Sequence, residues 1–318
     1  MATKLDALRK MTKVVADTGD VESVRRLKPT DCTTNPSILL KAVNMPEFEY
    51  TFQEAIAWGE RQNLNKANRI KVIADHLAVS VGAALVEFIP GRISTEIDAD
   101  LSFDVNGSIK RAENIIADYE SRKILRDRVL VKLAATWEGI QAAKVLQAKG
   151  IDCNLTLIFN KSQAIACADA GVFLISPFVG RITDWYKSYN GASTYTIEQD
   201  PGVISVREIY NYYKANNIKT IVMGASFRSV DQIEALAGCD SLTIAPKILT
   251  ELGSTYGGIE RRLSPDIFHP EEAIKMNETS FRWSMNEDAM ATELLASGIR
   301  GFALDLIKLY KLIYFRSI

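Results

Sequence analysis

The sequence predicts a parallel (β/α)8 barrel, and two observations lead to that prediction. Short apolar runs rich in Val, Ile, Leu and Thr recur eight times and alternate with longer helical patterns. Polar side chains gather at the C-terminal ends of these runs, where barrel enzymes place their chemistry. A doubly wound open sheet is the alternative, because its strands are also buried on both faces. No linker or change of composition divides the chain, so we expect one domain over residues 1–318.

Composition narrows the classes of function and location that we expect. The 318 residues include 38 Lys+Arg against 39 Asp+Glu, a net charge of −1, whereas a general nucleic-acid binder usually has a basic surplus. The four scattered cysteines and two histidines have no zinc-site spacing, and we expect reduced, buried thiols. The N-terminus lacks a signal-peptide core, and no stretch approaches the ~20 apolar residues of a membrane span. We therefore expect a cytoplasmic protein with no membrane or nucleic-acid partner.

The predicted strands and helices follow one another along the whole chain. The eight strands are 13–19, 31–36, 91–98, 128–136, 153–159, 172–181, 220–228 and 241–246. Apolar residues at helical spacing mark 46–63 and 65–89, between the second and third strands, and then 112–124, 136–150 and 205–217. The last pattern, 287–315, predicts a long docking helix rather than a membrane anchor, because charges such as Arg300 and Asp305 interrupt it.

Polar side chains recur on one face of the predicted strands. Residues two apart share a face of a strand, so Asp17 shares the face of Val15, and Lys132 that of Leu130. The same spacing pairs Thr33 with Asn35, Ser94 with Glu96, Asn154 with Thr156, Ser176 with Phe178, and Ser226 with Arg228. Seven strands that bring polar groups toward one mouth predict an active site rather than a packed core.

Lys132 is the most informative single residue, because apolar residues flank it on both sides. An ordinary lysine amine is protonated at neutral pH, and burying an unpaired charge costs several kcal/mol. The amine is therefore either ion-paired, for example with a glutamate, or held neutral as a nucleophile that forms a Schiff base with a ketone. Two carboxylates in register with it, Asp17 and Glu96, favour the nucleophile and suggest proton transfer; strand-end capping is their alternative role.

Amide and guanidinium groups indicate what the site would bind. Asn35 and Asn154 each carry a donor and an acceptor, which suits the hydroxyls of a sugar. Asn35 also precedes Pro36, so a turn or capping role is its alternative. Arg181 and Arg228 end the sixth and seventh strands and suit a phosphate, with surface salt bridges as the alternative. No Walker or GxGxxG loop supports a nucleotide cofactor.

Several long blocks of sequence resemble one known family. They include VVADTGD, DCTTNPSILL, PGRISTEIDADLSFD, LVKLAATWEGI, IDCNLTLIF, AGVFLISPFVGRITDWY and VMGASFR, and they run from about residue 10 to residue 246. On these blocks the chain resembles the transaldolase family, the Schiff-base-forming enzymes of the pentose phosphate pathway. The resemblance implies a single (β/α)8 barrel that needs no metal or cofactor. It also implies transfer of a dihydroxyacetone unit from sedoheptulose 7-phosphate to glyceraldehyde 3-phosphate, giving erythrose 4-phosphate and fructose 6-phosphate.

The resemblance further implies a role for most of the candidate site residues. Lys132 matches the Schiff-base lysine, Asp17 the acid/base at the carbon–carbon bond, and Glu96 with Thr156 the pair that holds the catalytic water. The substrate-binding residues that it implies are Asn35, Asn154 and Ser176 for the dihydroxyacetone hydroxyls and Arg181, Ser226 and Arg228 for the phosphate. We also expect Thr33, on the strand face of Asn35, and Ser94, on that of Glu96, to bind the substrate. Phe178 matches an apolar residue that fructose-6-phosphate aldolases replace with a tyrosine that helps to activate water; plain barrel packing is its alternative.

Other functions compete with this interpretation. A lysine-dependent aldolase similar to fructose-6-phosphate aldolase would cleave without transfer, and a non-catalytic relative would bind sugar phosphates through Arg181 and Arg228 alone. A pyridoxal-phosphate enzyme lacks support because no glycine-rich phosphate cup is present, and two histidines disfavour a metal-dependent isomerase. The apolar C-terminal residues either cover the barrel or meet a second subunit, and the family resemblance favours a homodimer.

Overall fold

The computed structural model describes residues 2–191 and 193–317, and its centre is a closed barrel of eight parallel strands paired in chain order. The strands are β1 (Lys13–Asp17), β2 (Asp31–Thr33), β3 (Ile93–Glu96), β4 (Val129–Ala134), β5 (Cys153–Ile158), β6 (Leu174–Pro177), β7 (Ile221–Gly224) and β8 (Ser241–Ile244). Each lies within one of the eight predicted ranges. The predicted barrel is confirmed, and the pairing of β1 with β8 excludes an open sheet.

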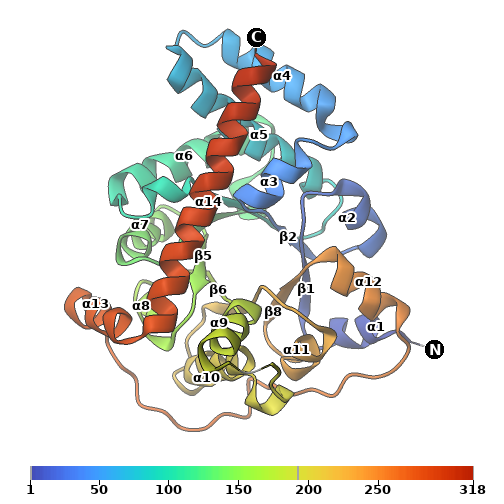
Figure 1. Ribbon diagram of the computed structural model, residues 1–318, viewed down its shortest axis with the longest axis vertical. Helices are drawn as coiled ribbons and strands as arrows, with labels where there is room; N and C mark the ends of the chain where they lie inside the picture. Colours follow the sequence, from blue (N-terminus) through green and yellow to red (C-terminus); the bar gives the residue numbers. More distant parts are fainter. Residues whose placement is uncertain (1, 192, 318) are drawn as a thin grey trace.

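Helices connect and surround the strands (Figure 1). They are α1 (Lys4–Arg9), α2 (Val21–Leu27), α3 (Pro36–Ala42), α4 (Glu49–Glu60), α5 (Lys66–Val86), α6 (Val105–Ser121), α7 (Trp137–Ala148), α8 (Lys161–Asp169), α9 (Gly180–Asn190), α10 (Pro201–Ala215), α11 (Val230–Ala235), α12 (Pro246–Ser254), α13 (Glu278–Glu287) and α14 (Ala289–Arg316). Four single 3-10 turns are η1 (Pro46–Phe48), η2 (Ala99–Leu101), η3 (Arg126–Arg128) and η4 (Ile197–Gln199). Helix α6 begins earlier than its apolar spacing predicts, because Asp104 caps it by accepting from the Gly107 amide.

Polar caps start helices directly after the strands. After β2, Asn35 accepts from the Ile38 amide and Pro36 takes the first helical position of α3. This cap ends the strand at Thr33, two residues before the end of the polar pair expected there. The short turn leaves Asn35 at the C-terminal mouth of the barrel, where it can also meet a ligand.

The inside of the barrel is divided into an apolar floor and a polar layer. Four buried side chains from four strands form a cluster of their own, separate from the main core: Val15, Leu130, Leu174 and Met223. Two residues further along the same strand faces come Asp17, Lys132 and Ser176. The apolar cluster therefore closes the barrel below the polar groups that face its mouth.

Strand β5 carries one extra residue relative to β6. The register shifts between Leu155 and Ile158, and Leu157 adopts a left-handed backbone with φ of 57°. Such a bulge is costly for a residue other than glycine and needs support from its surroundings. The buried Gln163 side chain of α8 supplies it, donating to the carbonyls of Leu157 (3.0 Å) and Ala135 (2.9 Å) and accepting from the Phe159 amide (2.8 Å).

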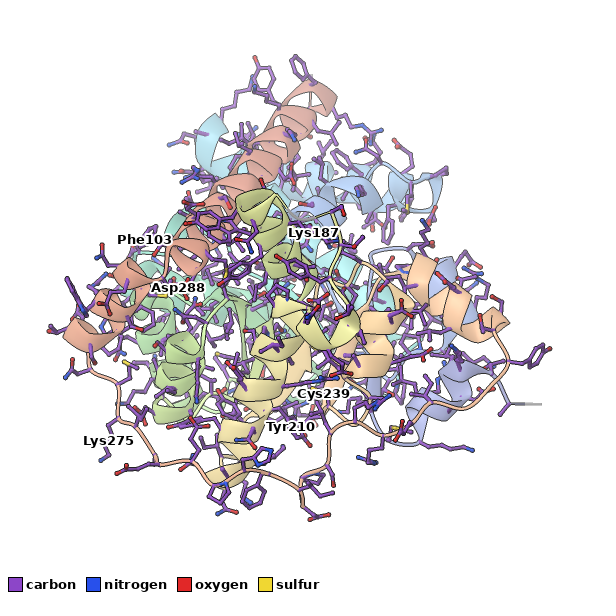
Figure 2. All side chains as sticks on the ribbon, turned by 60° about the horizontal axis from the view of Figure 1, so that its bottom comes forward. Phe103, Lys187, Tyr210, Cys239, Lys275 and Asp288 are labelled. Carbon is purple, nitrogen blue, oxygen red and sulfur yellow. The ribbon has the colours of Figure 1, made fainter. Side chains whose placement is uncertain are left out.

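Helix α14 crosses the molecule from α13 to the region of α4 (Figure 1). It starts where Asp288 caps it, and it then passes beside α9 (Figure 2). Its inward face is buried through Leu306, Leu309 and Ile313, whereas Ile307 and Phe315 are exposed. The segment that carries Lys275 joins α12 to α13 around the outside of the barrel (Figure 2). Among the helices that the structure describes, none has the length and apolarity needed to cross a bilayer.

Candidate active site

A cavity of about 200 Å³ opens at the C-terminal mouth of the barrel. Ten of the thirteen candidate residues line it: Asp17, Thr33, Asn35, Lys132, Thr156, Ser176, Phe178, Arg181, Ser226 and Arg228. The other three lie behind this wall: Glu96 contacts Lys132, Asn154 accepts from Ser176, and Ser94 accepts from Asn154. Five of the lining residues lie within strands, as the sequence predicts: Asp17, Thr33, Lys132, Thr156 and Ser176. The prediction that the other five also lie on strands is wrong, because the strands end earlier: Asn35 caps α3, Phe178 follows β6, Arg181 lies in the first turn of α9, and Ser226 and Arg228 follow β7. The site nevertheless brings these ten candidate residues together.

The Lys132 side chain is 6% exposed and meets two oxygens. Its Nζ lies 3.1 Å from Oε2 of Glu96 and donates to the Thr34 carbonyl at 3.2 Å. The buried lysine–glutamate pair considered as an alternative is therefore present, and it lies at the cavity rather than away from it. Burial raises the pKa of the Glu96 carboxyl, and the Lys132 charge opposes that rise. This pairing gives the amine a neighbour with which it can exchange a proton.

Asp17 reaches the cavity from the end of β1 and is held by a hydroxyl chain. The Thr33 hydroxyl donates to Oδ1 of Asp17 at 2.7 Å, and the Thr243 hydroxyl lies 2.7 Å from that of Thr33. Because the single proton of Thr33 goes to Asp17, Thr243 is the donor in the second bond. Burial raises the pKa of Asp17, while Lys132, the Thr33 bond and Arg181 act in the opposite direction.

The two asparagines occupy different layers of the site. Asn154 is fully buried; its Nδ2 donates to Ser94 at 3.1 Å and its Oδ1 accepts from Ser176 at 2.6 Å. These bonds hold the Ser176 hydroxyl at the cavity wall. Asn154 lies behind Ser176, and Ser94 lies behind Asn154. Asn35 caps α3, so its alternative role is present, and it also lines the cavity. Its binding of sugar hydroxyls stays a prediction.

The arginines and Ser226 form the other end of the cavity. Arg228 is exposed and bonded to Asp184 at 2.7 and 2.9 Å, so the surface salt bridge considered as its alternative exists. Arg181, half-buried in the first turn of α9, contacts two aromatic rings instead. Burial, followed by the charge of Arg228, lowers the pKa of Arg181. Two guanidiniums that converge on one opening favour an anionic group between them.

Thr156 follows Asn154 on the inner face of β5, just before the bulge. Its Oγ1 is buried and has no hydrogen-bond partner among the residues that the structure describes, although Thr156 lines the cavity. A buried hydroxyl without a partner costs roughly 1–3 kcal/mol. Thr156 therefore presents a polar group to whatever small molecule occupies this part of the cavity.

Five cavity residues are absent from the sequence-based set: Ala225, Phe227, Thr243, Ala245 and Phe302. Two of them, Thr243 and Phe302, show what the sequence could and could not have indicated. Thr243 could have been found, because residues two apart share a face of a strand, and Thr243 lies two residues after Ser241 on the inner face of β8. Phe302 of α14 could not, because helical periodicity marks an apolar face without indicating which surface it covers. The C-terminal helix, to which the sequence assigned no role in the site, thus forms part of the cavity wall.

Comparison with known proteins gives a consistent assignment. The family described as Transaldolase/Fructose-6-phosphate aldolase matches residues 14–313. The chain is 64% identical to a transaldolase of Rhizobium etli over 97% of its own length and 96% of that protein's. It is 61% identical to one of Agrobacterium fabrum, over 98% and 97% of the two chains, and 53% identical to one of Cellvibrio japonicus over the whole of both. The chain therefore belongs to the transaldolase/fructose-6-phosphate aldolase family.

Proposed function

We propose that this protein transfers a dihydroxyacetone unit between sugar phosphates, the transaldolase reaction, through a Schiff base on Lys132. The observation that carries the proposal is the position of this amine. It is buried, it lies 3.1 Å from Glu96, and it shares a cavity with Asp17 and with two arginines. A nucleophile, carboxyl groups for proton transfer and an anion site are the three components that this chemistry requires.

The first half of the reaction forms and uses an imine. The neutral Lys132 amine attacks the C2 ketone of sedoheptulose 7-phosphate, and loss of water from the carbinolamine leaves a protonated imine. Glu96 and Thr156 hold the water that leaves and later returns. Asp17 takes the proton of the C4 hydroxyl as the C3–C4 bond breaks, so that the bond electrons enter the imine and form an enamine. Erythrose 4-phosphate leaves as the aldehyde.

The second half reverses these steps on another aldehyde. The enamine attacks C1 of glyceraldehyde 3-phosphate, Asp17 returns its proton to the new hydroxyl, and hydrolysis of the imine releases fructose 6-phosphate. The enamine must survive between the two halves without being protonated by water. Two aromatic side chains, Phe178 and Phe302, give the cavity an apolar wall that helps to exclude water. Phe178 is 7% exposed and packs edge-on against Phe159, with ring centroids 5.5 Å apart.

Borohydride reduction tests the covalent step. We expect reduction in the presence of fructose 6-phosphate to attach a sugar-derived group to the peptide that contains Lys132. Lys132→Ala is expected to remain unlabelled and to lose turnover. A label on another lysine, or normal turnover of the variant, would overturn the proposal.

Product analysis separates transfer from simple cleavage. With fructose 6-phosphate alone, a transferase releases little free dihydroxyacetone, and adding erythrose 4-phosphate is expected to start rapid formation of sedoheptulose 7-phosphate. Rapid release of dihydroxyacetone without an acceptor would favour the aldolase instead.

We also propose a homodimer that works in the cytoplasm. The exposed apolar residues on the outer face of α14, Leu304, Ile307 and Phe315, support a contact with a second copy. The four free, buried cysteines are compatible with a reducing compartment. Light scattering of the wild type and of Ile307→Asp tests the dimer, since the variant is expected to be monomeric. Cell fractionation tests the location.

A further inference from the structure

One face of α14 fits closely against the Arg181 side chain. Phe302, 4% exposed, places its ring centroid 5.7 Å from Cζ of Arg181, and the ring of Phe178 lies 5.1 Å away from the same atom. The guanidinium thus contacts two aromatic rings, one from the end of β6 and one from the C-terminal helix. Such contacts stabilise a guanidinium and restrict its rotamers while leaving its N–H donors for an anion.

Gly298 gives this arginine the space that it occupies. It precedes Phe302 by four residues, so both lie on the same face of α14. A Cβ atom at this position would come 2.8 Å from Cδ2 of Leu157 and 3.3 Å from Nη1 of Arg181. Leu157 is fully buried on the β5 bulge and has little room to move. A methyl group here would therefore force the Leu157 side chain to shift and would press on the Arg181 guanidinium, which would have to yield by a few tenths of an ångström.

A glycine inside a helix has a cost of about 1 kcal/mol relative to alanine, so its presence calls for a local reason. At Gly298 the reason is the close approach of Leu157 and Arg181. Gly301, three residues further along the same helix, is exposed, and a Cβ atom there would meet nothing within 4 Å. The two glycines therefore differ in what they contact, although they share one helix.

The two arginines of the cavity are held in different ways. Arg228 is exposed and paired with Asp184, which fixes it through a charge on the surface. Arg181 is fixed through α14, which a hydrogen bond from Trp185 to Glu293 (2.7 Å) also ties to α9. The position of the inner guanidinium thus depends on how α14 docks.

We propose that Gly298 and Phe302 are positioning residues that set the Arg181 guanidinium at the distance from Lys132 that the phosphate end of the substrate requires. This inference rests on the proposed function and deepens it. The C-terminal helix then favours phosphorylated sugars through the position of the Arg181 guanidinium.

Matched glycine-to-alanine variants test this proposal. In a double-displacement reaction, kcat/KM for the acceptor reports only on the second half-reaction, the attack of the enamine on the acceptor aldehyde. Fructose 6-phosphate therefore serves as the common donor, and erythrose 4-phosphate and unphosphorylated erythrose are compared as acceptors. Gly298→Ala is expected to lower kcat/KM for erythrose 4-phosphate roughly three- to tenfold, and for erythrose by less than about twofold. Gly301→Ala is expected to leave both values unchanged and to raise the Tm slightly.

Phe302→Leu provides a second measurement that does not depend on how Gly298→Ala folds. It is expected to lower the preference for the phosphorylated acceptor in the same direction and to weaken competitive inhibition by inorganic phosphate. The proposal is wrong if Gly298→Ala and Phe302→Leu reduce both acceptors equally, or if they behave like Gly301→Ala. A wild-type protein without transferase activity would instead refute the proposed function, so the two failures are distinguishable.

Discussion

At the scale of single residues, the site places carboxyl groups where water cannot solvate them well. Burial raises the pKa of both Asp17 and Glu96, and the nearby Lys132 charge works against that rise in each case. An acid whose pKa is raised toward neutrality is better suited to exchange protons at physiological pH than an ordinary surface carboxylate.

The hydrogen bond from Thr33 to Asp17 makes the acid limb of the kcat/KM–pH profile sensitive to the Thr33 side chain. Thr33→Val removes the hydrogen bond that lowers the pKa of Asp17, so this pKa is expected to rise further. Because Asp17 must be ionised to accept the hydroxyl proton, the acid limb of kcat/KM for fructose 6-phosphate is expected to move to higher pH. The measurement is the pH dependence of kcat/KM for both proteins.

Thr243→Val is the control for this change. It leaves the bond between Thr33 and Asp17 in place and removes only the second hydroxyl. Its acid limb is expected to move less than that of Thr33→Val. An unshifted limb in Thr33→Val would mean that Asp17 is not the group that controls it.

The period of two residues along a strand predicted the candidates that lie on strands, such as Asp17, Lys132 and Thr156, but it placed Arg181 and Arg228 on strands that end before them. It could not show that Asn154 lies behind Ser176 rather than on the wall, because the depth of a residue inside a barrel depends on how the strands are staggered. Nor could it show that Lys132 is paired with Glu96 and lies at the cavity at the same time. The nucleophilic role of Lys132 stays a prediction.

At the scale of elements, the connection from β5 to α8 depends on one buried amide. Gln163→Leu keeps the volume of the side chain but leaves the Leu157 and Ala135 carbonyls and the Phe159 amide without this partner. The free energy of unfolding is expected to fall by roughly 2–4 kcal/mol. We also expect lower kcat, because the bulge that follows Thr156 loses its support. Urea unfolding and steady-state kinetics measure the two effects.

Ser162→Ala, at the neighbouring position of α8, is the matched control. It removes a single part-buried contact with the Ser284 hydroxyl and is expected to change stability by less than about 1 kcal/mol. A Gln163→Leu protein as stable as this control would contradict the role of Gln163 in supporting the β5 bulge.

The bulge itself could not be predicted from sequence. A left-handed residue in a strand is usually glycine, and this position holds a leucine, so the local sequence gives no signal. The strand is nevertheless correctly placed, because its β-branched and apolar composition does not depend on the irregularity.

At the scale of the whole molecule, the site lowers the stability of the fold in a pH-dependent way. The pKa of Asp17 in the folded protein lies above its ordinary value of 3.8, so ionisation costs folding free energy. That cost is absent below pH 3.8, grows as the pH rises through the folded-state pKa and is constant above it. Asp17→Asn is therefore expected to be inactive but more stable than the wild type at neutral pH, with a difference that shrinks as the pH falls. Urea unfolding across pH measures it.

Asp118→Asn should show the opposite sign. Burial raises the pKa of Asp118, but hydrogen bonds from His76 and Arg122 outweigh this, and the net pKa is lowered. Its carboxylate therefore stabilises the fold above pH 3.8, and the variant is expected to be less stable than the wild type at neutral pH. Equal behaviour of the two variants would contradict this assignment.

The barrel and the order of its strands followed from the alternation of patterns along the chain, whereas the place of α14 did not. An amphipathic helix of this length has several surfaces that it can cover, and only the packed structure selects one. The contacts that decide it, such as Gly298 against Leu157, join residues far apart in sequence.

The docking of α14 also has a consequence for biosynthesis. All eight strands emerge from the ribosome before Phe302 does, and folding during translation proceeds from the N-terminus. A nascent polypeptide can thus close the barrel around Lys132 before α14 adds Phe302 to the wall of the cavity.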